Sequence, residues 1–306
     1  MKKDLVSLAD LSPTELQSYL DDAVALKKVQ KAGQARSLLA GKTLGMIFQK
    51  PSLRTRVSFE IGMLQLGGHA LYLSPNEIQL GVRESVPDVA RVMSRYCDGL
   101  MARVFAHADV LTLAQNASVP VINGLSDFSH PCQGLADFLT IYEHKGPLAG
   151  LKLAFVGDAN NVYHSLLFAA AKLGTHIACA SPVGYAPSTR VLDLARPWAA
   201  ASGSQITATI DPFEAVRGAD VIYTDVWTSM GQEAEAEKRR VAMRPFQVNT
   251  TLVATAKKDV IVMHCLPAHR GEEITDDVVD GRHSVVFDQA ENRMHAQKAV
   301  LVRLMG

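Results

Sequence analysis

The chain has 306 residues, of which 48% are hydrophobic and 20% are charged, with 31 basic and 31 acidic side chains. This length suits two domains of roughly 150 residues each. The balanced charge argues against an electrostatic grip on nucleic acid, and the hydrophobic content argues against disorder. Neither a signal peptide nor a run of roughly 20 apolar residues is present. We therefore expect a cytoplasmic protein with a small-molecule ligand and no nucleic-acid or membrane partner.

The cysteines are widely separated along the chain, at Cys97, Cys132, Cys179 and Cys265. They form no C-x-x-C motif and no Cys/His ligand pair, which argues against a disulfide framework and against a zinc site. A dinucleotide fingerprint is also missing, because Gly157 is followed by Asp158 and no G-x-G-x-x-G motif occurs. The sequence thus predicts no bound metal and no cofactor.

Helix and strand signals alternate through the first half of the chain. Ser12-Pro13-Thr14-Glu15 combines an N-cap, a proline at the first helical position and a capping-box glutamate, so a helix should run to about Gln30. The predicted strands are Thr43–Phe48, His69–Leu73, Gly99–Val104 and Val119–Ile122. The predicted helices between and after them are a buried helix beyond Ser52, then Val86–Tyr96, Ala108–Gln115 and Gln133–His144. The helix beyond Ser52 has apolar residues on two faces, Val57, Ile61 and Leu64 on one and Phe59, Met63 and Leu66 on the other.

A second series of strands begins after Gly146-Pro147. Its predicted members are Leu151–Val156, Ile177–Ala180, Gln205–Ile210, Val221–Thr224, Val260–Met263 and Ser284–Phe287. This alternation predicts an α/β protein with two domains, each a parallel β-sheet flanked by helices. We expect domains at 1–146 and 150–289. The terminal amphipathic segment Asn292–Met305 could pack back on the first domain, so residues 290–306 are expected to belong there.

The stretch FQKPSLRTRVSFE, residues 48–60, places Ser52 to Thr55 where a strand meets a helix. Backbone N–H groups at a helix start have no helical partner and lie at the positive end of its dipole, so they bind anions. Two nearby arginines add charge-assisted hydrogen bonds. The alternative is an ordinary N-cap with solvated arginines, which the stretch alone does not exclude.

Four motifs together resemble the ornithine carbamoyltransferase family, nearly end to end and in the same order. They are Ser52-Leu-Arg-Thr-Arg56, His130-Pro-Cys-Gln133, Asp225-Val-Trp-Thr-Ser-Met-Gly231 and His264-Cys-Leu-Pro267. The first two are shared with aspartate carbamoyltransferases, and the last two are typical of the ornithine enzymes. The chain departs from the family at Leu53, where threonine is more frequent, and at Ala159, where glycine is frequent.

The resemblance implies a carbamoyl phosphate site in the first domain. Its phosphate ligands would be Ser52, Arg54, Thr55 and the backbone N–H of Leu53. Its carbamoyl and bridging ligands would be Arg103, His130, Gln133 and Arg293. Gln79 would reach the ligand from a neighbouring subunit of a homotrimer, or of a higher multiple of trimers, although a surface turn is the other interpretation of its loop.

The resemblance also implies an L-ornithine site in the second domain. Asp225 would pair with the α-ammonium, and Asn161 would contact the α-amino and carboxylate groups. Ser229 and Met230 would offer N–H groups to the carboxylate, while Cys265 and the adjacent Leu266 would lie by the δ-amine. Asp225 could instead cap the turn that follows its strand.

The implied reaction is carbamoyl transfer from carbamoyl phosphate to L-ornithine, with L-citrulline and phosphate as products, in arginine metabolism. Its catalytic residues would be Arg103, His130, Cys265 and Arg293. Two alternatives stay open: a carbamoyltransferase for another amine, such as putrescine, an acylated ornithine or aspartate, and a non-catalytic amino-acid-binding relative. The direction of the reaction in the cell also stays open.

Overall fold

A computed structural model describes residues 2–34, 36–229, 231 and 233–306. The chain divides into two compact units, which we call unit 1 (Met1–Leu139 with Glu291–Gly306) and unit 2 (Thr140–Ala290). The first boundary falls within helix α6 (Pro131–Lys145) and the second within helix α13 (Val286–Met305). Among the described residues, no helix combines the length and the apolar composition that a membrane span needs.

Unit 1 is built on a four-stranded parallel sheet in the order β2-β1-β3-β4. The strands are β1 (Thr43–Phe48), β2 (His69–Leu73), β3 (Gly99–Arg103) and β4 (Val121–Leu125). β3 is buried along its whole length, as expected for a parallel strand covered on both faces. Because the strands are parallel, β1 and β3 both end at one edge of the sheet, with Phe48 beside Arg103. The loop that contains Ser52 leaves from this edge.

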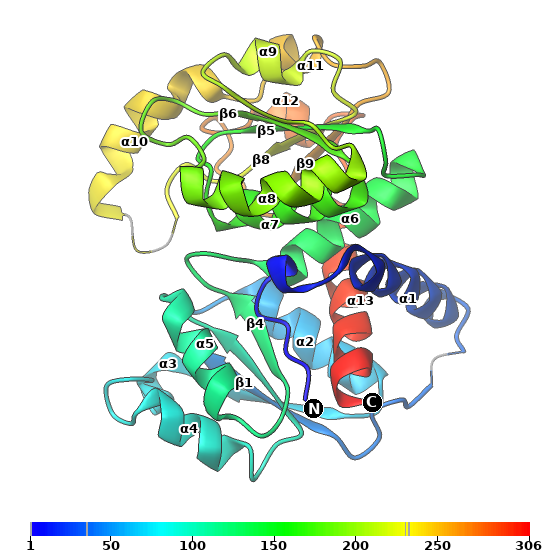
Figure 1. Ribbon diagram of the computed structural model, residues 1–306, viewed down its shortest axis with the longest axis vertical. Helices are drawn as coiled ribbons and strands as arrows, with labels where there is room; N and C mark the ends of the chain where they lie inside the picture. The colour runs from blue at the N-terminus through cyan, green and yellow to red at the C-terminus, as the bar shows by residue number, and fades with distance from the viewer. Residues whose placement is uncertain (1, 35, 230, 232) are drawn as a thin grey trace. The chain divides into compact units, whose positions relative to one another are not determined.

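Helices cover both faces of this sheet. They are η1 (Leu8–Asp10), α1 (Pro13–Lys31), α2 (Leu53–Gln65), α3 (Pro75–Ile78), α4 (Val86–Met93) and α5 (His107–Asn116), with parts of α6 and α13. Within unit 1, α4 and α5 lie on one face and α2 and α13 on the other (Figure 1). The Lys298 ammonium of α13 donates to Gln30 and Gln65, on α1 and α2. The expectation that the terminal helix packs on the first domain is confirmed.

Unit 2 is built on a five-stranded parallel sheet in the order β7-β6-β5-β8-β9. The strands are β5 (Lys152–Val156), β6 (His176–Ala180), β7 (Ile206–Thr209), β8 (Val221–Thr224) and β9 (Ile261–His264). The helices are α7 (Asn161–Leu173), α8 (Thr189–Ser202), α9 (Pro212–Val216), η2 (Glu233–Glu235), α10 (Ala236–Met243), η3 (Arg244–Phe246), α11 (Thr250–Val253) and α12 (Asp276–Val279). In Figure 1, α7 and α8 lie on one face of the sheet and α9 and α11 on the other. The predicted α/β class, with two parallel sheets flanked by helices, is confirmed.

The predicted strand Ser284–Phe287 is wrong. Ser284 forms an isolated bridge to Val262 and no named strand, and the backbone N–H of Gln289 then bonds to the Val285 carbonyl oxygen as α13 begins. The apolar run is real, since Val285 and Val286 are both buried. Burial of two consecutive valines is compatible with either element, so a short apolar run does not separate a strand from the first turn of a buried helix.

We expected both apolar faces of α2 to be buried, and this is wrong for a single chain, in which one of the two faces is exposed. Phe59 and Met63 are fully buried, whereas Val57, Ile61 and Leu64 are exposed to 44%, 37% and 66%. The exposed residues follow the spacing i, i+4, i+7 and form one stripe on the helix surface. Periodicity shows that a face is apolar, but it does not show that the same chain covers it.

Candidate active site

The loop before α2 holds its first turn in the geometry of a capped helix start. Ser52 is the N-cap residue, with an extended backbone, and its Oγ accepts a hydrogen bond from the Thr55 N–H at 3.3 Å. The Ser52 hydroxyl also donates to Thr55 Oγ1 at 3.1 Å. Both hydroxyls therefore lie together at the positive end of a helix, where an anion is stabilised.

Two arginines from distant parts of the sequence converge on Thr55, which is buried. Arg103, the last residue of β3, donates to Thr55 Oγ1 at 3.3 Å, and Arg293 on α13 donates to the same oxygen at 3.3 Å. Both arginines are more than nine-tenths buried. Three predicted phosphate or carbamoyl ligands are thus brought together in unit 1.

Gln133 is held on the other side of Arg293. The Arg293 guanidinium donates to Gln133 Oε1 at 2.5 Å, and Gln133 Nε2 donates to Asp137 Oδ1 at 2.7 Å. These contacts orient the amide, with its oxygen toward Arg293 and its nitrogen toward Asp137. Asp137 is fully buried one helical turn after Gln133, and the sequence analysis missed it. Its only signal was the i, i+4 spacing of a glutamine and an aspartate on a helix.

His130 precedes the first residue of α6 and is buried in a strongly positive environment. Burial, and then the charges of Arg293, Arg103, Lys50 and Arg54, hold the pKa of His130 well below its usual 6.5. The imidazole is therefore neutral at physiological pH, and it can donate one N–H without adding another charge. A neutral donor among several cations suits the oxygen of a substrate that also bears an anionic group.

Lys50 is a second residue that the sequence analysis did not single out, although it lies in the same FQKPSLRTRVSFE stretch. Burial, and then the neighbouring Arg103, lower the pKa of Lys50 to about 8. Its ammonium lies 4.9 Å from the centroid of the Phe105 ring, a cation–π contact. Lys50 adds to the positive potential around His130.

The remaining predicted residues of unit 1 are more exposed. Arg54 is half-buried and makes no ion pair with the described residues, whereas Arg56 bonds to Glu60 at 3.0 Å. Leu53 is 74% exposed, so its side chain packs little within the chain. Gln79 is exposed, with a left-handed backbone (φ 45°), and its amide donates to the Asn76 carbonyl oxygen at 3.5 Å. Among the described residues, Gln79 therefore does not bond to another predicted ligand.

In unit 2, Asp225 follows the end of β8 and is the centre of a cluster of hydrogen bonds. Its Oδ1 accepts from the Cys265 thiol at 3.0 Å and from the Val226 N–H at 2.8 Å, and its Oδ2 accepts from Asn160 Nδ2 at 2.8 Å. Asp225 is 7% exposed. The cluster lies at the carboxyl ends of β8 and β9, where open parallel sheets bind ligands.

Asn160, which the sequence analysis did not single out, contacts Asp225 from the start of α7. Asn160 is the N-cap of α7, and its Oδ1 accepts from the Val162 and Tyr163 N–H groups while its Nδ2 reaches Asp225. Asn161, half-buried, is the first residue of that helix. An asparagine just before an apolar helical run is a cap signal, which could have identified Asn160.

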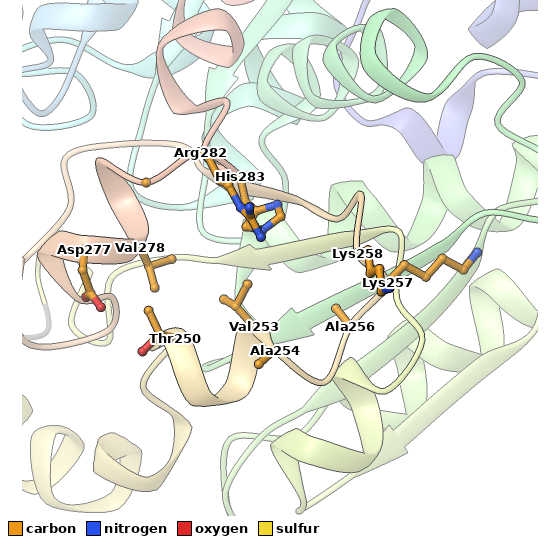
Figure 2. Close-up of a pocket in the computed structure, with 11 residues that line it drawn as sticks. Thr250, Val253, Ala254, Ala256, Lys257, Lys258, Asp277, Val278, Arg282 and His283 are labelled. Atoms are coloured by element: carbon orange, nitrogen blue, oxygen red, sulfur yellow. The ribbon is translucent and has the colours of Figure 1, made fainter.

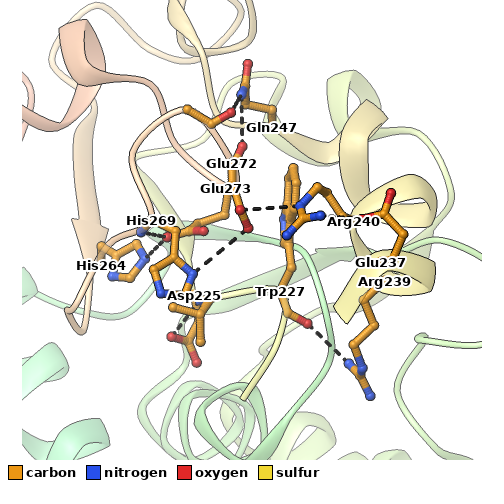
Figure 3. Close-up of polar contacts among 12 residues, drawn as sticks. Asp225, Trp227, Glu237, Arg239, Arg240, Gln247, His264, His269, Glu272 and Glu273 are labelled. Atoms are coloured by element: carbon orange, nitrogen blue, oxygen red, sulfur yellow. Dashed lines mark hydrogen bonds and ion pairs between the residues drawn. The ribbon is translucent and has the colours of Figure 1, made fainter. Parts of the chain in front are cut away.

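Arg239 of α10 holds the start of the loop after Asp225, where it contacts Trp227 (Figure 3). Arg239 is buried, and it donates to the Trp227 carbonyl oxygen at 3.3 Å and pairs with Asp158 at 2.7 Å. Burial raises the pKa of Asp158 despite this ion pair. Further along the loop, Ser229 is half-buried, and the predicted Met230 lies outside the described residues.

Cys265 and Leu266 follow β9 at the same edge of the sheet. Both are half-buried, and the Cys265 hydrogen bond to Asp225 requires a proton between sulfur and oxygen. Leu266 has a left-handed backbone (φ 57°), which is rare for a leucine. The structure therefore brings together Asp225, Cys265 and Leu266 of the predicted ornithine ligands.

Two groups of side chains among the described residues have three metal-ligating atoms within 4.8 Å of one another: Asp225, His264 and Cys265, and His269, Glu272 and Glu273. In the first group the donor atoms already bond to protein, since Cys265 bonds to Asp225 and both ring nitrogens of His264 have partners. In the second group Glu272 also faces Arg240 at 3.4 Å. A metal would have to displace these contacts, and we assign none.

Unit 2 also contains a pocket of about 450 Å³. Figure 2 shows the residues that line it. It is bounded by α11, α12 and the residues just before β9, at the amino ends of β8 and β9. Among the basic residues that line it, Lys257 pairs with Asp220 at 2.8 Å and His283 bonds to the Val260 carbonyl oxygen at 2.9 Å. The pocket is therefore at the opposite edge of the sheet from Asp225, and the predicted site residues do not line it.

Comparisons with known proteins match both halves of the chain to one family. The carbamoyl-P binding domain of aspartate/ornithine carbamoyltransferase matches residues 3–143, and the Asp/Orn binding domain matches residues 149–304. The chain belongs to the aspartate/ornithine carbamoyltransferase family. The resemblance found in the sequence motifs is confirmed.

Individual members of the family are similar over nearly the whole chain. An ornithine carbamoyltransferase of Pyrococcus horikoshii is 60% identical over 304 residues, covering 99% of this chain and 96% of the relative. An anabolic ornithine carbamoyltransferase of Pyrococcus furiosus is 59% identical with the same coverage. The solved structure of ornithine carbamoyltransferase from P. furiosus superposes with a TM-score of 0.97 at 59% identity, covering 100% of this chain and 97% of that one.

Proposed function

We propose that the protein is an ornithine carbamoyltransferase, which transfers the carbamoyl group of carbamoyl phosphate to the δ-amine of L-ornithine. The observation that carries the proposal is the convergence of Arg103 and Arg293 on Thr55 at the start of α2. This arrangement places cations, hydroxyls and helix N–H groups around one point, as a phosphorylated substrate needs. The names of relatives with about 60% identity support ornithine over the alternative acceptors.

In the proposed reaction, the δ-nitrogen forms a bond to the carbamoyl carbon, the bond from that carbon to the phosphate oxygen breaks, and the amine loses a proton. The products are L-citrulline and phosphate. Negative charge grows on the carbamoyl oxygen as the amine attacks, and on the bridging oxygen as phosphate leaves. Donors held in place before the reaction stabilise these charges more than they stabilise the ground state.

We assign carbamoyl phosphate to unit 1. Ser52, Arg54, Thr55 and the backbone N–H of Leu53 would hold the phosphate at the helix start, while Arg103 would bridge the phosphate and carbonyl oxygens. His130 would donate its N–H to the carbamoyl oxygen, which its neutral form permits because its pKa is depressed. Gln133 and Arg293, which bond to each other, would orient the carbamoyl amide.

We assign L-ornithine to unit 2. Asp225, buried with one oxygen facing Asn160, would pair with the α-ammonium through a charge-assisted hydrogen bond. Asn161 would contact the α-amino and carboxylate groups, and the loop of Ser229 and Met230 would offer N–H groups to the α-carboxylate. Cys265 and Leu266 would receive the δ-amine. A free alkylamine has a pKa of about 10, so the site must favour its deprotonated form for attack.

We further propose that the protein assembles as a homotrimer or a multiple of trimers, with a second copy of the chain covering the exposed stripe of α2. The stripe consists of Val57, Ile61 and Leu64, all more than one-third exposed in the chain by itself. A helix that is apolar on both faces is stable when both are covered. Gln79, exposed on a nearby turn of unit 1, would then serve a neighbouring subunit.

The assembly is tested by the mass of the protein in solution. Sedimentation velocity should give a multiple of three chains, and Ile61→Glu should dissociate it, because a carboxylate would be buried at the interface. A monomeric wild type, or an unchanged mass for Ile61→Glu, would contradict the proposed assembly.

A cytoplasmic location of the protein stays a prediction.

The activity is tested by offering purified protein carbamoyl phosphate with one amine at a time: ornithine, putrescine, N-acetylornithine or aspartate. Phosphate and the ureido product are measured together. Formation of citrulline with ornithine, and much slower reaction with the other amines, is the expected result. Turnover with none of the four amines would instead favour the binding-protein alternative.

A further inference from the structure

The turn after β9 contains a leucine in a conformation that leucine rarely adopts. Leu266 has φ 57°, in the left-handed region, where the Cβ of an L-residue meets its own backbone. Such residues persist when their surroundings determine the conformation, and they cluster at functional sites. The turn begins at Cys265, whose thiol bonds to Asp225. Whatever holds Leu266 therefore also sets the geometry at Cys265.

The contact that holds Leu266 comes from His264, the last residue of β9. The Leu266 N–H donates to His264 Nδ1 at 2.8 Å, so Nδ1 is an acceptor and the ring proton is on Nε2. His264 Nε2 lies 3.0 Å from Glu273 Oε1, to which it donates. Figure 3 shows the contact between His264 and Glu273. The carboxylate thus selects the tautomer that can accept from Leu266.

The Glu273 carboxylate contacts both ends of this turn, at His264 and at His269. The same Oε1 atom also accepts from the His269 N–H at 2.6 Å, while the backbone oxygen of Glu273 accepts from the Val248 N–H at 2.8 Å. The side chains of His264 and Glu273 are both 0% exposed. A second anchor comes from the His264 N–H, which donates to Gln289 Oε1 at 2.9 Å. The turn is therefore held from β9, from the 246–249 segment and from α13.

We propose that Glu273 and His264 form a positioning pair for ornithine, which acts by holding Cys265 and Leu266 in their observed geometry. Removal of a carboxylate from water is costly, and apolar side chains of similar volume can often replace buried charged groups without loss of stability. Stability alone is therefore a weak reason for a fully buried glutamate beside a histidine. The inference rests on the proposed function, because it takes Cys265 and Leu266 as ornithine contacts.

The first test separates the two nitrogens of His264. In His264→Asn the amide oxygen replaces Nδ1 and can accept from Leu266, whereas in His264→Gln the longer side chain replaces Nε2 and leaves Leu266 without its acceptor. We expect His264→Gln to raise the KM for ornithine about tenfold or more above that of His264→Asn. The KM for carbamoyl phosphate should be unchanged in both. Equal ornithine KM values for the two variants would overturn the proposal.

The second test uses rescue at Glu273. Glu273→Gln keeps an acceptor oxygen for His264 and His269, and its NH₂ group takes the place of Oε2, which is buried without a partner among the described residues. Glu273→Leu has a similar size and no acceptor. The ornithine KM should stay within about threefold of wild type for Gln and rise about tenfold or more for Leu. Equal values for Gln and Leu would refute the positioning role.

Wild-type protein measured in the same assay separates failure of this inference from failure of the proposed function. Without citrulline formation by the wild type, the function itself is refuted. ¹⁵N NMR of the histidine side chains gives a readout that does not depend on turnover: the His264 signals should show the Nε2–H tautomer in wild type. A protonated Nδ1 there would overturn the pair.

Discussion

Replacement of Asp225 by asparagine tests whether this carboxylate binds the α-ammonium of ornithine. The carboxylate accepts from Cys265, Val226 and Asn160 at 2.8 to 3.0 Å, and it is 7% exposed. Asparagine keeps the shape and loses the charge that would pair with the α-ammonium. Hydrogen bonds to charged groups contribute about 1.5 to 3 kcal/mol, which corresponds to about 10- to 150-fold in affinity. The KM for ornithine, measured by citrulline formation at saturating carbamoyl phosphate, should rise within this range.

Asp220 provides a matched control at the other end of the same strand. It precedes β8, is 5% exposed and pairs with Lys257 at 2.8 Å. Asp220→Asn removes a buried charge of the same kind, so it should lower the melting temperature while leaving the ornithine KM near that of wild type. The reasoning is refuted if Asp225→Asn and Asp220→Asn have the same ornithine KM.

Three predictions concern unit 1. Arg54→Ala should raise the KM for carbamoyl phosphate about tenfold or more. Arg56→Ala should change this KM little, because the Arg56 guanidinium bonds to Glu60. Equal effects of the two substitutions would contradict the assignment of Arg54 to the phosphate. Leu53→Thr should lower that KM about fivefold through one added hydrogen bond, and a large increase would show that the leucine packs at the site. The pKa of His130 lies well below 6.5 in the folded chain, so the unfolded chain binds the proton first as the pH falls. The free energy of unfolding should therefore fall as the pH drops below 6.5. Urea titrations of His130→Gln should show a smaller fall than wild type, and an equal fall would contradict the pKa assigned to His130.

The alternation of strands and helices was readable from the sequence because parallel strands covered on both faces are short, apolar and bounded by turns. β1, β2 and β8 have the predicted bounds, and the other strands differ by one to three residues at either end. Ser284–Phe287 was misassigned because its valines are buried at the start of a helix. The exposed face of α2 was misassigned because periodicity reports apolar character without reporting what covers it.

The site was predictable where a motif places a side chain directly at a sheet edge or helix start, as with Thr55, Asp225 and Cys265. It was not predictable where a residue acts through a partner distant in sequence. Glu273 follows Glu272 in an acidic pair, and the sequence gives no sign that one is fully buried against His264 while the other faces Arg240. Such differences arise only when the 264–269 turn and the 246–249 segment are packed together.

The transfer of label from [¹³C]carbamoyl phosphate to L-ornithine tests the central claim most directly. ¹³C NMR of a reaction with purified protein should show the label in the ureido carbon of L-citrulline, with one phosphate released for each citrulline formed. The account is contradicted if phosphate is released while the label appears in bicarbonate or cyanate, or if the label stays in carbamoyl phosphate at the rate of the control without enzyme.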